Sequence, residues 1–462
     1  MSKAAASPEP NTMPQVAWPE ITGKGLDCLV SLISALDATQ HLSAGEISRN
    51  QRVQLKVLVQ HASKHSPHFA RRLRRAGVKP ADIIKPGALQ RLDVLRRRDI
   101  QSAGEALRCA EVPPRHLPLN KGETSGSTGE PVVVIRTALN RLFWMAMTMR
   151  EHAWNKRDFS LRSTSVRANI PALAYLDNWG PPAGLLFKTG RSQGIPITAD
   201  AAQQAAWIKD FDPTYLLHYP SSLEALCDHC GKHSINFTSL RQIRSIGETL
   251  SPALRTRAEK ILGAKAVDTY SSNEVGVIAI ECPLSGLYHI MAENLLVEIL
   301  NEDGTPSASG EIGRVIITDL HNFATPVVRY DIGDYAEVGE TCPCGRGLPT
   351  LKRILGRERN LVAMPDGTRH WPLVGFDAFR DVAPVMQYQL LQHDSQNIEM
   401  RLVVERKLTV AEERELQRIV QSSLGYSFDI RFTYFPGNIP RGPGGKFEEF
   451  ICLVSPDQKP IN

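Results

Sequence analysis

The sequence predicts an α/β fold in which a large, multi-subdomain amino-terminal domain precedes a small, mobile α+β carboxy-terminal domain. Its 462 residues exceed the size at which a single hydrophobic core stops growing, so more than one domain is expected. In the middle third, short apolar runs alternate with helical patterns, as is typical of α/β proteins. Beyond Gly356 the pattern becomes strand, helix, strand. We therefore expect a tail at residues 1–20, a large domain at 21–355 and a small domain at 356–462.

The elements of the large domain follow in order. Residues 1–20 are rich in Ala, Ser and Pro and lack an apolar signal core, so a flexible tail is expected. Apolar residues at three-to-four spacing predict helices from Ser48 to about Ala103. The alternation that follows predicts strands at 132–135, 215–219 and 275–280, and a helix at 251–262.

The hairpin and carboxy-terminal elements follow. From residue 297, the run VEIL, the turn NEDG and the run GEIGRVIITDL predict an antiparallel hairpin subdomain. In the small domain, the patterns predict a strand at 400–405, a helix at 410–424 and a strand at 429–435.

Composition excludes several classes of protein. Hydrophobic residues make up 42% and charged residues 22% of the chain, which is the balance of a globular protein. A net charge of +5 is mild, and we interpret the basic run at 68–77 as the solvated face of an amphipathic helix rather than a nucleic-acid site. No apolar run approaches the roughly 18 residues of a membrane span. We expect a cytoplasmic protein without nucleic-acid or membrane partners, and leave open whether it is a homodimer.

A glycine and hydroxyl-rich loop is the clearest local motif. Thr124, Ser125, Gly126, Ser127, Thr128 and Gly129 precede a strand-like run. Closely spaced glycines let backbone N–H groups approach an anion, and the hydroxyls add donors, so the loop suits a polyphosphate. It is not a Walker loop, because Glu130 stands where that motif has lysine. Taken alone, the segment could also be a polar linker.

Further motifs follow this loop in a fixed order. They are Gly247-Glu248-Thr249-Leu250, then Asp268-Thr269-Tyr270-Ser271-Ser272-Asn273-Glu274, then Arg329-Tyr330-Asp331-Ile332-Gly333-Asp334, then Gly356-Arg357, and last the glycine-rich run that ends at Lys446. This ordered set resembles the adenylate-forming superfamily of acyl-CoA synthetases, adenylation domains and luciferases. Within it, the chain is most similar to the phenylacetate-CoA ligase family, from about Arg52 to Lys446.

The resemblance implies an ATP-dependent enzyme that joins a small carboxylic acid to AMP and passes the acyl group to coenzyme A. It implies that residues 124–129 cradle the phosphates, with Gly247, Glu248, Asp268 and Ser271 also lining the nucleotide site. Glu274 would hold Mg²⁺, and Tyr270 would stack on adenine. Asp334 would bind the ribose and Arg357 would lie near the ribose and phosphate.

The same resemblance assigns the catalytic lysine and the acid pocket. Lys446, on the mobile domain, would bridge the carboxylate and the α-phosphate; its alternative is an ordinary solvated lysine. Tyr219, Gly247 and Ser272 fall where related enzymes bind the acid, although each also has an ordinary packing explanation. The chain departs from the family pattern at Ser271 to Asn273, and at the junction, where Arg359 and Asn360 replace the usual acids.

Four residues predict a metal site. Cys342 and Cys344 lie in one turn, and Cys282 and His289 precede them by about 50 to 60 residues, so three thiols and one imidazole form a ligand set that suits structural Zn²⁺. Unliganded surface thiols are the alternative. For Cys227 and Cys230, a second pair at C-x2-C spacing in a predicted helix, we favour simple burial.

Two alternatives to the CoA ligase stay open. The first keeps adenylation but transfers the acyl group to a carrier-protein thiol or to an amine. The second is a non-enzymatic, zinc-containing interaction protein. The sequence leaves the identity of the acid open, with an aryl or arylacetic acid as the favoured class.

Overall fold

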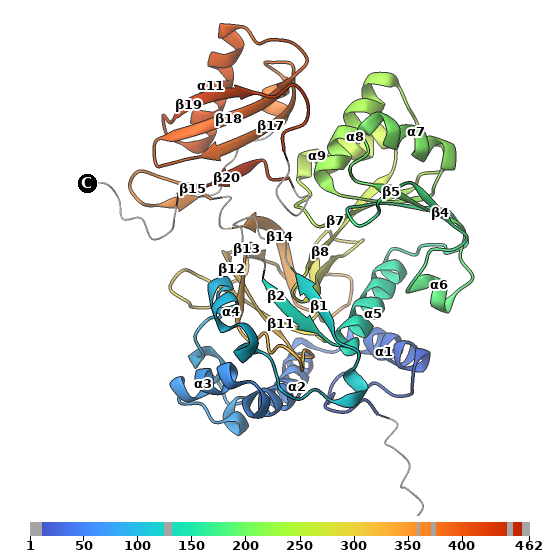
Figure 1. Ribbon diagram of the computed structural model, residues 1–462, viewed down its shortest axis with the longest axis vertical. Coiled ribbons are helices and arrows are strands. Elements are labelled where there is room, and N and C mark those ends of the chain that lie inside the picture. The colour runs from blue at the N-terminus through green and yellow to red at the C-terminus, as the bar shows by residue number, and fades with distance from the viewer. Residues whose placement is uncertain (1–11, 124–131, 358–360, 371–375, 441–446, 455–462) are drawn as a thin grey trace, which may run out of the picture. The chain divides into compact units, whose positions relative to one another are not determined.

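The computed structural model describes residues 12–123, 132–357, 361–370, 376–440 and 447–454 (Figure 1). The described chain divides into two compact units. The first contains residues up to Thr249 together with Ala258–Leu355, and the second contains Leu250–Arg257 together with Gly356 onward. Within the described residues, every helix is too short or too polar to span a lipid bilayer.

The amino-terminal part of the first unit is helical. Its helices are α1 (Leu26–Thr39), α2 (Ala44–His65), α3 (Pro67–Arg75) and α4 (Arg97–Ala103), with short 3-10 turns η1 (Pro80–Asp82), η2 (Leu89–Arg91), η3 (Gly104–Leu107) and η4 (Pro114–His116). Helix α2 begins at a capping box, in which Ser43 and Glu46 satisfy each other's backbone N–H groups. The predicted helical stretch 48–103 is therefore confirmed at residues 48–75 and 97–103, whereas residues 76–96 form turns and two short 3-10 helices.

Residues 12–20 correct the predicted tail. Met13 and Trp18 are buried, and the backbone N–H of Met13 donates to Ile21 O at 2.8 Å. The predicted tail of residues 1–20 is therefore too long, because these apolar side chains join the core formed with α1 and α2.

Strands and helices alternate along the rest of the first unit and through residues 250–257 of the second. The structure has β1 (Asn120–Glu123), β2 (Val133–Arg136), α5 (Ala138–Trp154), β3 (Ser163–Arg167), β4 (Ala174–Leu176), α6 (Ala183–Leu186), β5 (Ser192–Pro196), α7 (Ala201–Phe211), β6 (Tyr215–His218), α8 (Pro220–His233), β7 (Gln242–Ile246) and α9 (Pro252–Leu262). Strands β3, β5, β6, β7 and β8 (Lys265–Ser272) pair in parallel, as an α/β fold requires. Cys227 and Cys230 on α8 are buried among apolar residues, which confirms the simple burial that was favoured for them.

The remaining strands of this unit are mostly antiparallel. They are β9 (Gly276–Glu281), β10 (Tyr288–Ile290), β11 (Leu295–Leu300), β12 (Ile312–Asp319), β13 (Tyr330–Val338) and β14 (Thr350–Arg357). The predicted hairpin from residue 297 is confirmed, since β11 and β12 pair antiparallel. It does not form a separate subdomain, because one twelve-stranded sheet runs in the order β11-β12-β13-β14-β10-β9-β8-β7-β6-β3-β5-β4.

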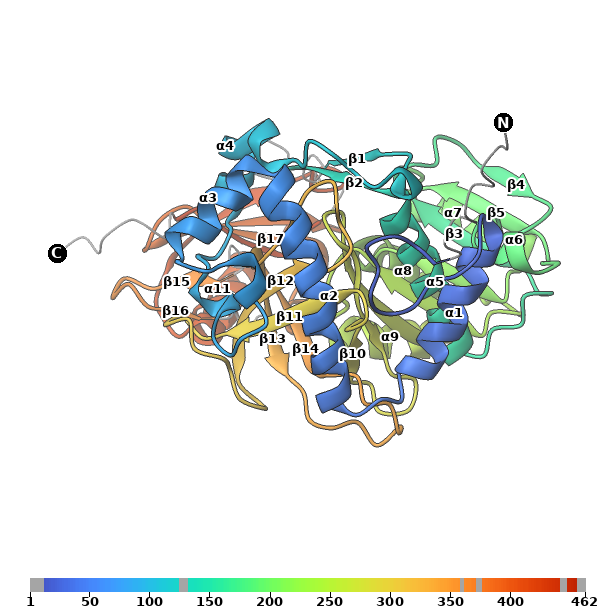
Figure 2. The ribbon, with the colours of Figure 1, turned by 90° about the horizontal axis from the view of Figure 1, so that it is seen from below.

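Helices cover this sheet, and apolar side chains fill the space between. Figure 2 shows α2 crossing the strands β10 to β14, and side chains of α1, α2 and α5 share one buried cluster with residues of β9 and the segment before β11. Gln51 of α2 donates to the carbonyls of Ala292 and Leu295 at 2.9 and 3.0 Å, which fixes the helix against the start of β11.

The second unit is a small α+β domain. It contains β15 (Val362–Ala363), β16 (Arg369–His370), α10 (Phe376–Arg380), β17 (Val385–Gln392), β18 (Asn397–Val404), α11 (Val410–Leu424), β19 (Asp429–Tyr434) and β20 (Phe450–Cys452). A four-stranded sheet in the order β19-β18-β17-β20 packs against α11 around its own core. The predicted strand at 400–405, helix at 410–424 and strand at 429–435 are confirmed within a residue or a few at their ends.

Candidate functional site

The predicted phosphate loop connects the two strands of a hairpin. Strands β1 and β2 pair antiparallel, with Glu123 opposite Val133. Residues 124–129 of the loop lie outside the described residues. A cavity of about 340 Å³ at the base of this hairpin is lined by Arg108, Cys109, Val112, Leu119, Asn120, Lys121, Ile135 and Ala324. None of the predicted site residues that the structure describes lines this cavity.

Two predicted nucleotide-binding residues touch each other. The hydroxyl of Tyr270 on β8 donates to Oδ2 of Asp334 on β13 at 2.6 Å. In the sheet order these strands are four steps apart, which would separate them by about 19 Å in a flat sheet. A tyrosine side chain cannot cross that distance, so the sheet must curl strongly between β8 and β13. This curl brings residues 64 positions apart in the sequence into one site.

A second contact joins the turn after β8 to the start of β13. Glu274, two residues beyond β8, is only 5% exposed, and the hydroxyl of Tyr330 at the start of β13 lies 3.4 Å from its Oε1. Ser272 accepts a hydrogen bond from the Val275 N–H at 3.3 Å, which shapes the turn that carries Glu274. Among the described residues this carboxylate has only a long hydroxyl contact, and a buried carboxylate with so distant a partner suits a cation as an additional ligand.

Two of the three predicted acid-pocket residues, Tyr219 and Gly247, lie together. Gly247 follows β7 with a φ of +79°, and a Cβ built there would lie 2.8 Å from Cε1 of Tyr219. Only glycine therefore fits against this ring without strain. Glu248 accepts the Ser221 N–H at 2.9 Å, so its carboxylate also holds the first turn of α8, which begins directly after Tyr219.

Asp268 has a structural environment. It is 7% exposed, its Oδ2 accepts the Tyr288 hydroxyl at 2.9 Å, and its N–H donates to Glu281 at 2.7 Å. These contacts join β8, β9 and β10 beneath Tyr270. Ser271, next to Tyr270, is half-buried at the end of β8.

The four predicted metal ligands converge. The ligand atoms of Cys282, His289, Cys342 and Cys344 all lie within 4.8 Å of one another. Sγ of Cys342 is 3.7 Å from Sγ of Cys282, and Sγ of Cys344 is 3.2 Å from Nε2 of His289. Tetrahedral Zn²⁺ with Zn–S bonds of about 2.3 Å separates two sulfurs by roughly 3.8 Å, so the spacing suits this ion.

The ionisation of His289 and Cys282 fits metal binding, whereas burial raises the pKa of the Cys342 thiol. Burial lowers the pKa of His289 to about 4, so the imidazole is neutral at pH 7. Burial alone would raise the pKa of Cys282, but hydrogen bonds from the backbone of Ser285 and Leu284 outweigh it, and the pKa is lowered. The His289 Nδ1 lies 3.3 Å from Leu348 O, which leaves Nε2 facing the thiols.

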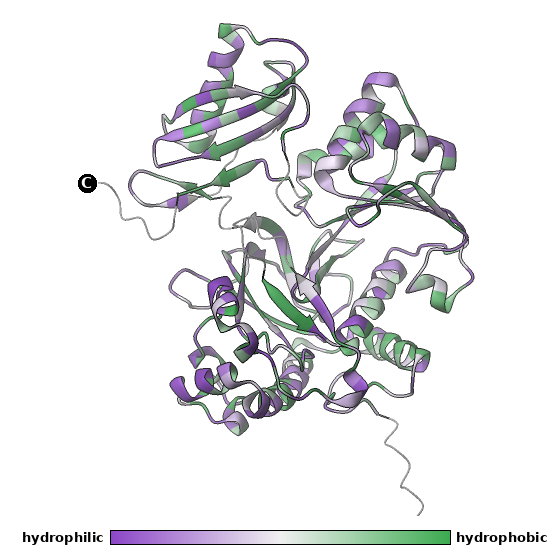
Figure 3. Cartoon of the chain, in the orientation of Figure 1, coloured by the Kyte–Doolittle hydropathy of each residue, from purple (hydrophilic) through white to green (hydrophobic). Residues whose placement is uncertain are grey.

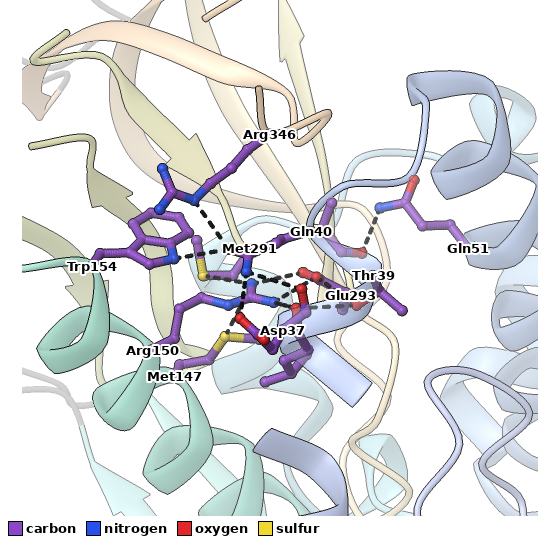
Figure 4. Close-up of polar contacts among 12 residues, drawn as sticks. Asp37, Thr39, Gln40, Gln51, Met147, Arg150, Trp154, Met291, Glu293 and Arg346 are labelled. Atoms are coloured by element: carbon purple, nitrogen blue, oxygen red, sulfur yellow. Dashed lines mark hydrogen bonds and ion pairs between the residues drawn. The ribbon is translucent and has the colours of Figure 1, made fainter. Parts of the chain in front are cut away.

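The turn that carries Cys342 and Cys344 is fastened to two helices of the first unit (Figure 4). The guanidinium of Arg346 lies over the ring of Trp154 on α5, 4.1 Å from its centroid. Arg346 Nε and Trp154 Nε1 both donate to Oε1 of Gln40, at 3.0 and 2.8 Å. The Gly347 N–H donates to Gln40 O at 2.9 Å, so the residue after α1 binds the turn through its side chain and its backbone.

A buried ion pair lies beside this contact. Arg150 on α5 bonds Glu293 at 2.7 and 3.1 Å, and both side chains are almost fully buried. Thr39 donates to the same carboxylate at 2.9 Å. The end of α1, helix α5 and the segment before β11 are thereby connected next to the metal-ligand cluster.

Some predicted site residues lie outside the described part of the chain, and some contacts of the site were not predicted. Lys446, Arg359 and Asn360 lie outside the described residues, and so does the side chain of Arg357. Sequence reasoning missed the contacts of Tyr330 and Tyr288. Tyr330 stands inside the motif that ends at Asp334, so an aromatic hydroxyl in that motif was an available signal; nothing near Tyr288 marked it.

Comparisons with known proteins agree with this geometry. Residues 122–324 match the family model described as AMP-binding enzyme. The phenylacetate-coenzyme A ligase of Escherichia coli is 26% identical over 432 residues, covering 88% of this chain and 95% of that protein. The phenylacetate-coenzyme A ligase of Thermus thermophilus is 24% identical over 439 residues, covering 87% and 96%.

Solved structures show the same fold. A 2-hydroxyisobutyryl-CoA ligase in its postadenylation state superposes with a TM-score of 0.71, at 19% identity, over 90% of this chain and 91% of the other. The family model, the matching relatives and the ordered motifs together identify an adenylate-forming, AMP-binding enzyme that is similar to the phenylacetate-CoA ligases.

Proposed function

We propose that this AMP-forming acid–thiol ligase activates an aryl or arylacetic acid with ATP and transfers the acyl group to coenzyme A. The observation that carries the proposal is the pair of contacts that unites Tyr270 with Asp334 and Glu274 with Tyr330. They support one nucleotide site built from motifs that are far apart in the sequence. The related phenylacetate-coenzyme A ligases support the class of acid and the thiol acceptor.

The reaction has two steps. A carboxylate oxygen of the acid attacks the α-phosphorus of ATP, and the bond to the β-phosphate breaks, which releases pyrophosphate. The acceptor sulfur, having lost its proton, then attacks the acyl carbon, and AMP leaves. The first step brings two anions together, so it requires oriented donors and positive charge.

Residues of this chain are proposed to meet that need. Residues 124–129 would cradle the β- and γ-phosphates, and Lys446 would stand between the carboxylate and the α-phosphate. The Tyr270 ring would stack on adenine while its hydroxyl orients Asp334 toward the ribose, and Arg357 would lie near the ribose and phosphate. Gly247, Glu248, Asp268 and Ser271 would shape the rest of the nucleotide site.

Glu274 is proposed to hold Mg²⁺. Its carboxylate is buried, with Tyr330 in long contact, and carboxylate oxygens are ligands that this ion prefers. When bound, the ion supplies positive charge to the phosphate oxygens.

The acid pocket would lie around Tyr219, Gly247 and Ser272. The Tyr219 ring packs directly against the backbone of Gly247, so an aromatic surface borders this position. Such a surface suits the ring of an aryl or arylacetic acid.

Pyrophosphate release tests the proposal. A panel of carboxylic acids should give the highest rate with aryl or arylacetic acids, and CoA thioester should form with them. Lys446→Ala should lower acyl-adenylate formation by roughly two or more orders of magnitude, as loss of a transition-state charge does. Lys407→Ala, which removes an exposed lysine of the second unit, is the matched control. Unchanged adenylation in Lys446→Ala would remove this lysine from the mechanism.

The acceptor has two alternatives, a carrier-protein thiol and an amine. Supplying wild-type enzyme and acid with CoA, with a phosphopantetheinyl carrier protein or with amines separates them by product. Thioester formation on CoA alone supports the proposal, and product formed only with a carrier or an amine contradicts it.

We also propose that Cys282, His289, Cys342 and Cys344 bind one structural Zn²⁺. Their spacing and the neutral His289 support this ligand set. Metal analysis of protein purified without chelator should find about one zinc per chain, and Cys344→Ser should lower that value. Protein that is fully folded and free of zinc under these conditions would contradict the site.

A further inference from the structure

The positive charge of the chain is concentrated in one segment. Residues 64–108 contain twelve Lys and Arg and four Asp and Glu, a net charge of +8, although the whole chain has +5. The remaining residues are therefore net negative. So local an excess at the surface creates a field that attracts anions to one place on the molecule.

Several of these arginines lie on α3 and on the chain that begins α4, two segments that Arg72 connects through its hydrogen bond to Asp93 O. Arg71 and Arg74 lie on the solvent side of α3, and Arg96 and Arg98 are exposed at the start of α4. Figure 3 shows α3 largely hydrophilic, in contrast to the largely hydrophobic α1. We call Arg71, Arg74, Arg96 and Arg98 the basic face. No acidic side chain among the described residues forms an ion pair with these four; the nearby Arg75 is paired with Asp93 at 2.8 Å.

A buried arginine holds α3 in place behind the basic face. Arg72 is 7% exposed, and its guanidinium donates to the carbonyls of Asp93 at 2.6 Å and Val328 at 3.1 Å. Burial lowers its pKa to about 10, which leaves it charged at neutral pH. The helix is therefore fixed to the chain just before α4 and to the chain just before β13.

The basic face begins next to the proposed nucleotide site. Leu95 pairs with Tyr330, its N–H donates to Arg329 O at 2.7 Å, and its carbonyl accepts the Asp331 N–H at 2.9 Å. Arg96 follows Leu95 directly, while Tyr330 contacts Glu274. A charge in this segment thus lies within a few residues of the strand that carries Asp334.

We propose that the basic face binds the 3′-phosphate and diphosphate of coenzyme A, and so delivers its thiol to the acyl-adenylate. The inference rests on the proposed CoA acceptor. Arginine forms paired hydrogen bonds with phosphate oxygens, and four arginines without acidic partners match an acceptor with several phosphate charges. A nucleic acid fits less well, because the rest of the chain is net negative and would repel a longer polyanion.

Dephospho-CoA, which lacks only the 3′-phosphate, provides the test. Wild-type enzyme should prefer CoA to dephospho-CoA by about tenfold in kcat/KM, the value of one charge-assisted contact. In the double variant Arg96→Gln/Arg98→Gln, kcat/KM should fall for CoA but hardly for dephospho-CoA. The preference for CoA over dephospho-CoA should therefore shrink to about twofold. The variant Arg71→Gln/Arg74→Gln should shift the ratio in the same direction. Arg191→Gln, at an exposed arginine beside β5, is the matched control and should keep the wild-type ratio.

Binding provides a readout without turnover. Calorimetric titration of the enzyme with CoA and dephospho-CoA should show the same difference in dissociation constants, and the difference should shrink as salt is added. An unchanged ratio in both double variants overturns the inference, while thioester formation by wild-type enzyme would leave the proposed function standing. Failure of the wild-type enzyme to bind CoA would overturn both the inference about the basic face and the proposed CoA acceptor. The adenylation step would still be tested by pyrophosphate release with ATP and acid alone.

Discussion

At the scale of single residues, Gly247 borders the proposed acid pocket at a position that has no space for a side chain. Its φ of +79° favours glycine, and a Cβ would meet Tyr219 at 2.8 Å. Gly247→Ala should therefore displace the ring and raise the KM for the acid by about tenfold. Gly263→Ala is the matched control, since Gly263 has a φ of +68° and open space around its Cα. Equal effects of both variants on KM would show that backbone strain, and not the ring, is responsible.

Glu274 provides a second prediction at this scale. Glu274→Gln removes a buried charge, so the concentration of Mg²⁺ that gives half-maximal pyrophosphate release should rise by about tenfold or more. Tyr330→Phe removes only the hydroxyl 3.4 Å away and keeps the charge, so its effect on that concentration should be small. An equal Mg²⁺ requirement in wild type and Glu274→Gln would remove Glu274 as the ligand.

At the scale of elements, the metal-binding turn is fastened to α1 and α5 through Arg346. Its guanidinium covers Trp154 and donates to Gln40 (Figure 4). Arg346→Ala should lower the free energy of unfolding by about 1–2 kcal/mol and make zinc loss to a chelator faster. Trp154 fluorescence should change when the metal is removed. Zinc release at the wild-type rate in Arg346→Ala would show that the turn does not depend on this contact.

The sequence predicted helices and strands well where a regular apolar pattern marks them. It predicted them poorly where contacts with distant segments determine the local structure. The strand at 215–219 and the helix at 410–424 follow from their apolar patterns. Helix α1 and the packing of Met13 were not predicted, because short apolar stretches acquire a structure only against α2 and the sheet. The motif order identified Tyr270 and Asp334 as site residues, but their contact depends on the curl of the sheet, which no local pattern encodes.

At the scale of the whole molecule, stability should depend on a buried charge cluster between α5 and β7. Glu151 forms ion pairs with Arg157 at 2.5 Å and with Arg244 at 3.0 Å. Burial would raise the pKa of Glu151, but the two arginines outweigh it and lower the pKa to about 2. The ionised carboxylate therefore contributes stability above about pH 4.5, and this contribution is lost as the pH falls toward 2.

Urea unfolding measures this dependence. At pH 7, Glu151→Gln should unfold at a lower urea concentration than wild type. Its free energy of unfolding should be lower by about 3 kcal/mol, because two arginines lose their buried partner. The difference should narrow at pH 3.5, where part of the wild-type advantage is lost. An equal difference in the free energy of unfolding at the two pH values would contradict the lowered pKa of Glu151.

The curl between β8 and β13 has a consequence for synthesis of the protein on the ribosome. A nascent chain that has emerged only as far as residue 300 already contains Tyr270 and Glu274, but it lacks both Asp334 and Tyr330. Contacts of such long sequence separation form late, after the entropy of closing the intervening loop has been overcome. A chain stalled at this length would therefore have Glu274 without Tyr330 and Tyr270 without Asp334. A protease added to such stalled chains should cut near residue 274 until the chain has emerged beyond residue 334.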